Sequence, residues 1–316
     1  MGADCPGRAD PVLIVYFFVR LIGESEQALS KFGLGFVFGN DWDVSRDIYR
    51  GAPLVVGTLI TSGIALVIGV PVAVAAALFI NEMCPRRLRS PLAILVDLLA
   101  AVPSVVYGLW GFFVLGPKLL PVEKWFAGTF SFIPWIGMSH QEMINNPITP
   151  TNYFIAGLIL AIMILPIVSA ISREVIATVP AEHKEAALAL GATRWEMIRM
   201  AVIPYARPGI TGGAMLGLGR ALGETIAVVL VIGAAPTIGK HLFNQGYSLA
   251  SVIANEYGEA SGIHISALFA AGLVLFVLTL IVNIMARGLV ARGQRGLRGS
   301  GATGVTVAPL PGGGAQ

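Results

Sequence analysis

Two charged residues interrupt a strongly apolar stretch, residues 216–233, which reads LGLGRALGETIAVVLVIG. Arg220 and Glu224 lie four residues apart in it. The planar guanidinium of an arginine can donate two parallel hydrogen bonds to a phosphate-type oxyanion. The carboxylate can hold the arginine partly neutralised, repel a second anion or take up a proton. A buried ion pair that fixes the register of a helix is the structural alternative. The two residues therefore predict either a polar pathway for an oxyanion or a structural ion pair.

The helix that must position these residues is predicted over 209–235, which places Arg220 near its middle. At about 100° per residue, one arc of about 80° contains Gly209, Gly213, Gly217, Arg220 and Glu224. Glycines leave room on that side for a neighbouring helix or for a passage. Arg220 and Glu224 can pair across one helical turn when no ligand is present. We expect a substrate pathway bordered by Gly213, Gly217, Arg220 and Glu224.

The composition places the chain among membrane proteins with several spans. Of its 316 residues, 55% are hydrophobic and 12% are charged, and the mean hydropathy is +0.78. A soluble domain carries about twice that charged fraction. Runs of about 20 apolar residues mark membrane spans. Five such runs are clear: 53–80, 91–116, 152–172, 209–235 and 265–286. The sequence thus predicts an all-α polytopic membrane protein.

A sixth span begins at Pro11, in the segment PVLIVYFFVRLIG, but Arg20 interrupts it. Either this helix continues to about Leu29 with Arg20 and Glu24 paired, or the given start truncates it. Lys and Arg residues gather in the cytoplasmic connections of such proteins. With the N-terminus inside, the inside segments hold 13 basic residues and the outside segments hold six. This bias predicts six transmembrane helices with both termini in the cytoplasm.

Three regions are predicted along the chain. Residues 1–51 hold the short first helix and an outside loop, and residues 52–290 form the transmembrane domain. Residues 291–316 are rich in glycine and are expected to form a disordered cytoplasmic tail. Cys5 and Cys84 lie in separate segments without metal-ligating neighbours, so they predict neither a disulfide framework nor a metal site.

The longest inside connection, residues 173–208, carries the signals of two short helices. Pro180 suits the first turn of one helix, and Gly191 ends it. A capping box that begins at Thr193 opens the second helix, which we expect to end by Pro204. A short, exposed helix rich in alanine suits insertion into a cleft on another protein. A helix lying on the membrane surface is the alternative.

The run EAALALGATRWEMIRMAVIP within this connection resembles the EAA signature of ABC importer permeases. Five residues stand at the spacing of that signature: Glu185, Ala186, Ala187, Gly191 and Pro204. Ala201 and Ile203 depart from it, because they stand where the signature has isoleucine and leucine. The resemblance implies that this loop docks into a groove on a cytoplasmic ATPase subunit. Closure of the ATPase pair would then be transmitted to the spans.

The chain offers no ATP-binding loop of its own. A Walker A loop ends with glycine, lysine and then serine or threonine, and it begins with another glycine. The nearest approach, AAPTIGKH, has Ala234 in place of the first glycine and His241 in place of the serine or threonine. The predicted spans also lack a nucleophile–base set and a cluster of metal ligands. We expect a transport subunit without cofactor or enzymatic activity, which takes its energy from a separate ATPase.

Three further segments narrow the resemblance: GLGRALGET at 217–225, DLLAAVPSVVYGLWGFFVLGP at 97–117 and ILPIVSAISREV at 164–175. Together with the EAA run they look like the permease subunit of ABC-type phosphate importers, the PstC type. The resemblance covers about residues 52–290 and implies the type I, MetI-like fold in the plasma (inner) membrane of a bacterium. It assigns Arg220 and Glu224 to a phosphate pathway. The implied partners are a second permease subunit of the PstA type, two cytoplasmic ATPase subunits and an extracytoplasmic phosphate-binding protein.

Two rival interpretations keep this fold and change the role. One is a permease for another oxyanion, such as molybdate, sulfate or phosphonate. The other is a membrane scaffold that takes part in phosphate signalling.

Asp97 is the seventh residue of the span predicted over 91–116, and we expect it to snorkel or to pack between helices.

Overall fold

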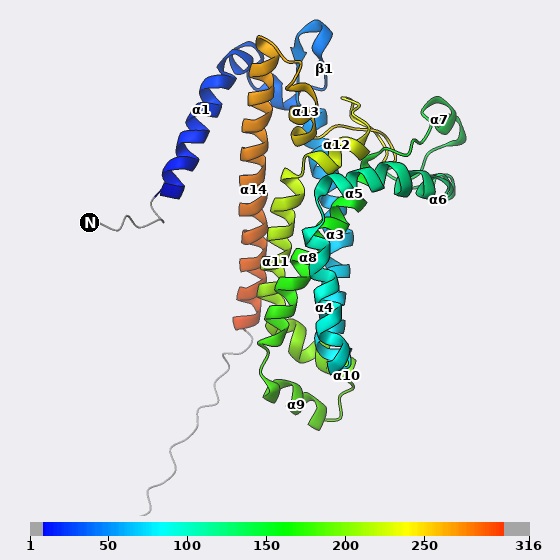
Figure 1. Ribbon diagram of the computed structural model, residues 1–316, viewed down its shortest axis with the longest axis vertical. Coiled ribbons are helices and arrows are strands. Elements are labelled where there is room, and N and C mark those ends of the chain that lie inside the picture. Colours follow the sequence, from blue (N-terminus) through cyan, green and yellow to red (C-terminus); the bar gives the residue numbers. More distant parts are fainter. Residues whose placement is uncertain (1–8, 300–316) are drawn as a thin grey trace, which may run out of the picture.

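The computed structural model describes residues 9–299, which form a long helical bundle with one small β-hairpin (Figure 1). The bundle and its connections consist of α3 (Ala52–Leu78), α4 (Arg86–Ala101), α5 (Ser104–Trp110), α6 (Gly116–Thr129), α7 (His140–Asn145), α8 (Tyr153–Ala177), α11 (Ile203–Gly223), α12 (Ile226–Ile232) and α14 (Ile263–Gly299). Helices α3, α8, α11 and α14 run along its length (Figure 1).

The two ends of the bundle differ in what they carry (Figure 1). One end, here the α9 end, carries α9 (Ala181–Ala189) and α10 (Arg194–Met197). The other, the hairpin end, carries the antiparallel strands β1 (Trp42–Asp43) and β2 (Ile48–Tyr49), which flank the 3-10 turn η2 (Val44–Arg46). The short helices α2 (Gly35–Phe38) and α13 (Leu249–Glu256) also lie there.

Helix α8 is the centre of the bundle. Of its most apolar window 61% is buried, against 22–28% in the three other continuous spans. It packs against α3, α4, α11 and α12. Close approach of α3 depends on Gly69, because a Cβ there would lie 3.0 Å from the carbonyl oxygen of Ala161. Asn152 begins α8, since its side-chain oxygen accepts a hydrogen bond from the Ile155 N–H at 2.9 Å.

The described chain contains several helices that could cross a membrane. Four segments are long and apolar enough to cross a membrane: Ala52–Met83, Ser104–Thr129, Tyr153–Ala177 and Ile263–Gly288. A bent pair, Arg194–Gly223 with Ile226–Ile232, supplies a fifth if it counts as one span. The all-α polytopic class predicted from the sequence is confirmed.

Helix α1 (Ala9–Phe32) occupies the place of the predicted sixth span. It continues past Leu29, and Arg20 forms an ion pair with Glu24 at 3.1 Å, as the first of our two alternatives has it. Both side chains of this pair are exposed, and α1 is not among the segments apolar enough to span. It packs along α14. A sixth crossing therefore stays a prediction.

The span predicted over 91–116 is not one helix. Helix α4 ends at Ala101, Val102 is extended (φ −69°, ψ 126°), and α5 begins at Ser104. Pro103 explains the break, because proline lacks an N–H and disfavours helical backbone at the residue before it. Figure 1 shows α4 running along the bundle and α6 projecting sideways from it. The apolar segment that can span a membrane is accordingly Ser104–Thr129.

Within residues 9–299, three π-helical turns widen the helices: η3 (Phe79–Met83), η4 (Gly111–Leu115) and η5 (Ile198–Val202). Each ends two residues before a proline, namely Pro85, Pro117 or Pro204. A proline ring crowds the carbonyl four residues earlier, and a wider turn relieves that clash. At η5 the helix continues through Pro204 to Gly223. The expectation that the second helix of the connection ends by Pro204 is therefore wrong.

The C-terminal helix is longer than the sequence predicted. Helix α14 continues to Gly299, so the first part of the segment that we expected to be disordered is helical. Residues 300–316, and Cys5 near the other terminus, lie outside the described residues.

Candidate functional site

The helix that carries the charged pair is broken directly beside it. Helix α11 ends at Gly223, and α12 leaves at an angle of 65°. Glu224 stands in the break with an extended backbone (φ −71°, ψ 126°). The predicted continuous helix over 209–235 is thus wrong in this one place. The segment after the break, α12, does not continue the line of α11. Its residues Ala227, Val228 and Val231 are buried in the core around α8.

Arg220 lies in the last turn of α11, where the negative end of the helix dipole favours a cation. Its side chain is exposed in the single chain, and Glu224 is half-buried. Among the residues that the structure describes, no ion pair joins Arg220 to Glu224. The expected pairing across one turn is absent, since the backbone of Glu224 is no longer helical.

The glycine stripe of α11 makes a helix contact. Gly213 and Gly217 are buried against α8. A Cβ at Gly217 would lie 2.9 Å from Val168 Cγ2, and one at Gly213 would lie 3.2 Å from Ile171 Cβ. Of the two uses that the sequence left open for these glycines, the structure has the close approach of a neighbouring helix. The candidate pathway site thus reduces to Arg220 and Glu224.

A second face of α11 is open, and part of it borders a groove between α11 and α14 that Gly212 and Gly219 help to line. Nothing lies within 4 Å of a Cβ built at Gly212, Gly219 or Gly223. These three glycines approach the bend from the side that α8 does not cover. A second protein or a polar passage can therefore reach the bend with little steric hindrance from α11 itself.

At the α9 end, the structure confirms the helix–glycine–helix arrangement of the connection. Helix α9 begins after Pro180, and Gly191 follows it with φ +85°, a conformation that favours glycine. Thr193 and Glu196 form a complete capping box, with Thr193 N–H donating to Glu196 Oε2 at 2.7 Å.

The EAA residues divide between solvent and core. Glu185, Ala186, Gly191 and Pro204 are exposed, whereas Ala187 packs on an apolar cluster of α3, α8 and η5. Leu190 is 90% exposed, which is unusual for a leucine beside a packed core. A groove beside α9 is lined by His183, Ala187, Leu190, Gly191, Ala192, Glu196, Met200, Ala201, Pro204 and Tyr205. This end presents a surface suited to a partner protein.

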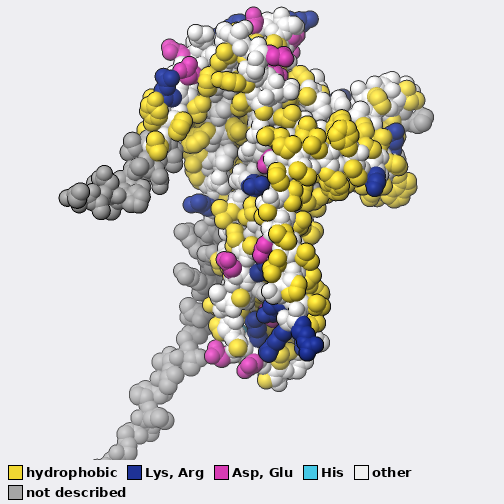
Figure 2. Space-filling view, in the orientation of Figure 1, with side chains coloured by type: hydrophobic (Ala, Val, Ile, Leu, Met, Phe, Trp, Pro, Cys, Tyr) yellow, Lys and Arg dark blue, Asp and Glu magenta, His cyan; other side chains and the backbone are white. Residues whose placement is uncertain are grey.

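Basic side chains surround that surface. Figure 2 shows Lys and Arg side chains gathered at the α9 end, near α4 and α10. The exposed arginines of these elements and their neighbours are Arg86, Arg87, Arg89, Arg194 and Arg199. The remainder of the face shown in Figure 2 is largely apolar along the α4–α6 side, as expected of a surface in contact with lipid.

Two ion pairs at this end escaped the sequence reasoning. Lys184 Nζ of α9 lies 2.6 Å from Glu82 Oε1 of η3, and both side chains are largely buried. Arg173 of α8 pairs with Asp97 of α4. Asp97 thus pairs between helices, one of the two roles expected for it. The sequence offers no spacing signal for either pair, because the partners are distant along the chain.

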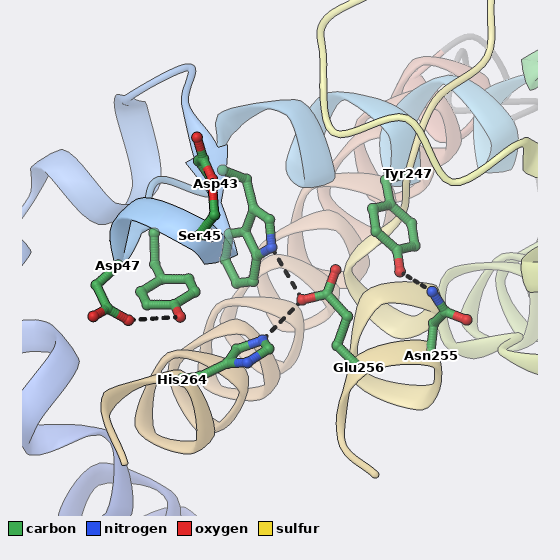
Figure 3. A network of polar contacts seen from close by, with 9 residues as sticks. Asp43, Ser45, Asp47, Tyr247, Asn255, Glu256 and His264 are labelled. Carbon is green, nitrogen blue, oxygen red and sulfur yellow. Dashed lines mark hydrogen bonds and ion pairs between the residues drawn. The ribbon is translucent and has the colours of Figure 1, made fainter. Parts of the chain in front are cut away.

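The hairpin end holds a polar network that joins distant segments (Figure 3). Glu256 Oε2 accepts a hydrogen bond from Trp42 Nε1 at 3.1 Å and lies 2.9 Å from His264 Nε2. The Tyr49 ring stacks on His264, with centroids 5.1 Å apart. Burial, followed by the nearby Asp47 carboxylate, raises the pKa of Tyr49 to about 12. Burial likewise raises the pKa of Tyr247. The network fixes the hairpin to α13 and α14.

The chain is similar to several known proteins along most of its length. Residues 69–294 match the family described as the binding-protein-dependent transport system inner membrane component. The chain is 41% identical to the phosphate transport system permease protein PstC of Pasteurella multocida, over 89% of this chain and 87% of that protein. It is also 41% identical to PstC 2 of Mycobacterium tuberculosis, over 92% and 90%.

Solved structures agree on the fold. A bacterial alginate ABC transporter chain superposes with a TM-score of 0.58 at 18% identity, covering 90% of this chain and 93% of that one. A chain of the inward-facing MetNI methionine transporter gives a TM-score of 0.50 at 15% identity, covering 76% and 93%. These likenesses show the predicted importer-permease fold. The family match shows that the chain is a multi-pass inner membrane protein. The chain therefore belongs to the binding-protein-dependent inner membrane transport components, as a permease of the phosphate transport PstC type.

Proposed function

We propose that this chain forms one half of the pathway for inorganic phosphate in an ATP-driven importer. In this proposal Arg220 binds the passing anion, and Glu224 limits how tightly it is held. The observation that carries the proposal is an exposed guanidinium at the break of a membrane span. Non-helical backbone within a membrane is tolerated where it lines a cavity or is covered by protein, and broken helices form the substrate sites of many transporters.

The exposure of Arg220 supports a second subunit. An arginine at the centre of a bilayer costs about 2.5–3.5 kcal/mol on insertion scales, so it does not face lipid without compensation. In the single chain its side chain is uncovered, and the adjoining face of α11 is open. A second permease of the PstA type would cover this face and leave a polar passage between the two chains. Each subunit then supplies half of the lining.

The α9 end supports coupling to ATP hydrolysis. Glu185 and Ala186 are exposed on the short helix α9, and Gly191 is exposed just beyond its end, so a partner protein can bind them. We assign this end to the cytoplasm, because its arginines satisfy the preference of basic residues for that side. One ATPase subunit docks on the α9 end of this chain, and a second docks on the permease partner. Both termini are cytoplasmic in this arrangement, and the hairpin end faces an extracytoplasmic phosphate-binding protein.

The decisive experiment measures uptake with competing anions. The chain is co-produced with its permease, ATPase and binding-protein partners, and ATP-driven uptake of radioactive phosphate is followed in vesicles. We expect uptake that excess unlabelled phosphate suppresses and that molybdate, sulfate or phosphonate leaves largely intact. Stronger suppression by one of those anions would reassign the substrate. Normal phosphate signalling without any uptake would instead indicate the scaffold role.

A further inference from the structure

The π-helical turn η3 joins four elements at the α9 end. Three successive residues of this turn each contact a different neighbour. The Ile80 carbonyl accepts from Arg89 of α4 at 3.0 Å, and Asn81 Nδ2 donates to the Arg173 carbonyl of α8 at 2.7 Å. Glu82 pairs with Lys184 of α9 at 2.6 Å. Helices α4, α8 and α9 therefore meet at the end of α3.

The contact with α4 follows from the proline that ends the turn. In the π register, the residue at position 85 would donate its N–H to the carbonyl five residues earlier, that of Ile80. Pro85 has no N–H, and the Ile80 carbonyl needs another donor. Arg89 Nε supplies it. The turn is thus completed by a side chain of α4, and α4 is held to α3 as a consequence.

Helix α9 contacts the bundle through one ion pair and through packing. Ala187 packs on the apolar cluster below it, and the His183 ring lies 6.1 Å from the Tyr205 ring of α11. Within the described residues, Lys184–Glu82 is the ion pair that α9 makes. The side chains of Lys184 and Glu82 are 22% and 10% exposed, whereas those of the Arg46–Asp43 pair at the hairpin end are 74% and 31% exposed. A pair so shielded is weakly screened by water and salt, and its geometry is correspondingly well defined.

The contacts continue from η3 into the central helix. Asn81 binds the main chain of Arg173, and the Arg173 side chain pairs with Asp97 of α4. Besides the chain connection through residues 178–180, which joins α9 to the end of α8, a displacement of α9 therefore acts on Glu82. From η3 it reaches α8 through Asn81, and α4 through Arg89 and Arg173. Helix α8 in turn packs on α11, which carries Arg220.

We propose that Lys184 and Glu82 are the positioning residues through which movement of α9 reaches the membrane helices. This inference rests on the proposed function, because it presupposes that an ATPase moves α9. The ion pair transmits pull as well as push, whereas the apolar contact of Ala187 resists only push. Without the pair, ATP hydrolysis continues and the spans fail to follow it. The signature of its loss is uncoupling, with less phosphate moved for each ATP hydrolysed.

The test reverses each charge and then exchanges the two. Lys184→Glu, Glu82→Lys and the double exchange are compared with the unsubstituted chain in proteoliposomes that contain all partners. Uptake and ATP hydrolysis are measured in the same sample. Coupling between sites typically corresponds to about 5–150-fold, and we expect each single variant to lower the ratio of uptake to hydrolysis at least about fivefold. The double exchange should restore at least half of the ratio.

Controls separate uncoupling from misfolding. Arg46→Glu breaks the exposed pair with Asp43 and should leave the ratio unchanged. Each variant is checked for assembly by co-purification of the ATPase subunits. If a reversal prevents assembly, the near-isosteric Lys184→Met and Glu82→Gln replace it and decide the question in the same way.

Two results would overturn the inference alone. One is an unchanged ratio in assembled single variants, and the other is a double exchange that couples no better than the singles. Absence of ATP-driven uptake in the unsubstituted complex would instead refute the proposed function, and this inference would fall with it.

Discussion

The α9 end and the bend of α11 handle charge in opposite ways. At the α9 end, Lys184, Glu82, Arg173 and Asp97 are paired across four elements. At the bend, Arg220 is exposed, and Glu224 lies just beyond the end of the helix, where it is not paired with Arg220. A paired charge holds helices in a fixed relation, whereas a charge without a partner in its own chain is available to a ligand. The same molecule thus combines a tightly connected end with an uncommitted site.

The largest effect is expected at the bend. Arg220→Gln should lower phosphate uptake about 100-fold, because losing a two-pronged, charge-assisted contact costs about 3 kcal/mol. Membrane insertion and ATPase co-purification should be unchanged. Uptake of radioactive phosphate in vesicles measures the effect. Arg207→Gln, an exposed arginine earlier in α11, is the matched control and should transport normally. Normal uptake by Arg220→Gln would remove the contrast between the two regions.

The two faces of α11 sharpen the contrast. A Cβ at Gly209 would overlap Val175 of α8, while nothing lies within 4 Å of one at Gly212. Gly209→Ala should destabilise the chain by about 1–3 kcal/mol through overpacking. Gly212→Ala should be neutral or stabilising, because alanine favours a helix by about 1 kcal/mol over glycine. Thermal unfolding in detergent measures both. Equal unfolding temperatures would mean that the glycine face is not a tight contact.

A smaller effect is expected beside α9. Gly191 has φ +85°, and a non-glycine residue there costs about 1–2 kcal/mol. Gly191→Ala should therefore shift the orientation of α9 and lower ATPase co-purification about fivefold to tenfold. Gly258→Ala is the control, since nothing crowds that position and its backbone is unstrained. Unaltered co-purification would show that the partner does not depend on how Gly191 sets the helix.

The smallest effect is expected at the hairpin end, which takes no part in either charge arrangement. Trp42→Phe removes the N–H that Glu256 accepts and leaves the His264 contact in place. The loss of this hydrogen bond should lower the free energy of unfolding by about 1 kcal/mol. Hydrogen exchange of residues 42–49 should quicken, with uptake unchanged. Trp135→Phe, at a ring that is 65% exposed, should alter neither. A marked fall in uptake for Trp42→Phe would extend the functional region to this end.

Local signals in the sequence predicted the α9 end well. Pro180, Gly191 and the Thr193 capping box act within one or two turns, and each is found as expected. The continuation through Pro204 was missed, because a π-helical turn that accommodates a proline has no simple sequence signature. The break at Pro103 does have a local signal, which is the proline itself. It was missed because the long apolar run around Pro103 predicted one continuous span.

The site at the bend was predicted in its residues and missed in its geometry. Arg220 and Glu224 are evident because charge is rare among apolar residues. Their spacing of four suggested a pair, but pairing at that spacing requires an unbroken helix. The break depends on the packing of α12. Its residues lie in the core around α8, which they could not reach if α12 continued in line with α11.

The sequence by itself determined the membrane class, the identity of the charged residues and the form of the α9 connection. These follow from composition and from interactions between residues close in the chain. Only the tertiary structure decided the bend at Glu224, the side of α11 that α8 covers and the joining of α3, α4, α8 and α9 at one turn. Each of these depends on contacts between segments far apart in sequence, and the spacing of residues along the chain carries no record of such contacts.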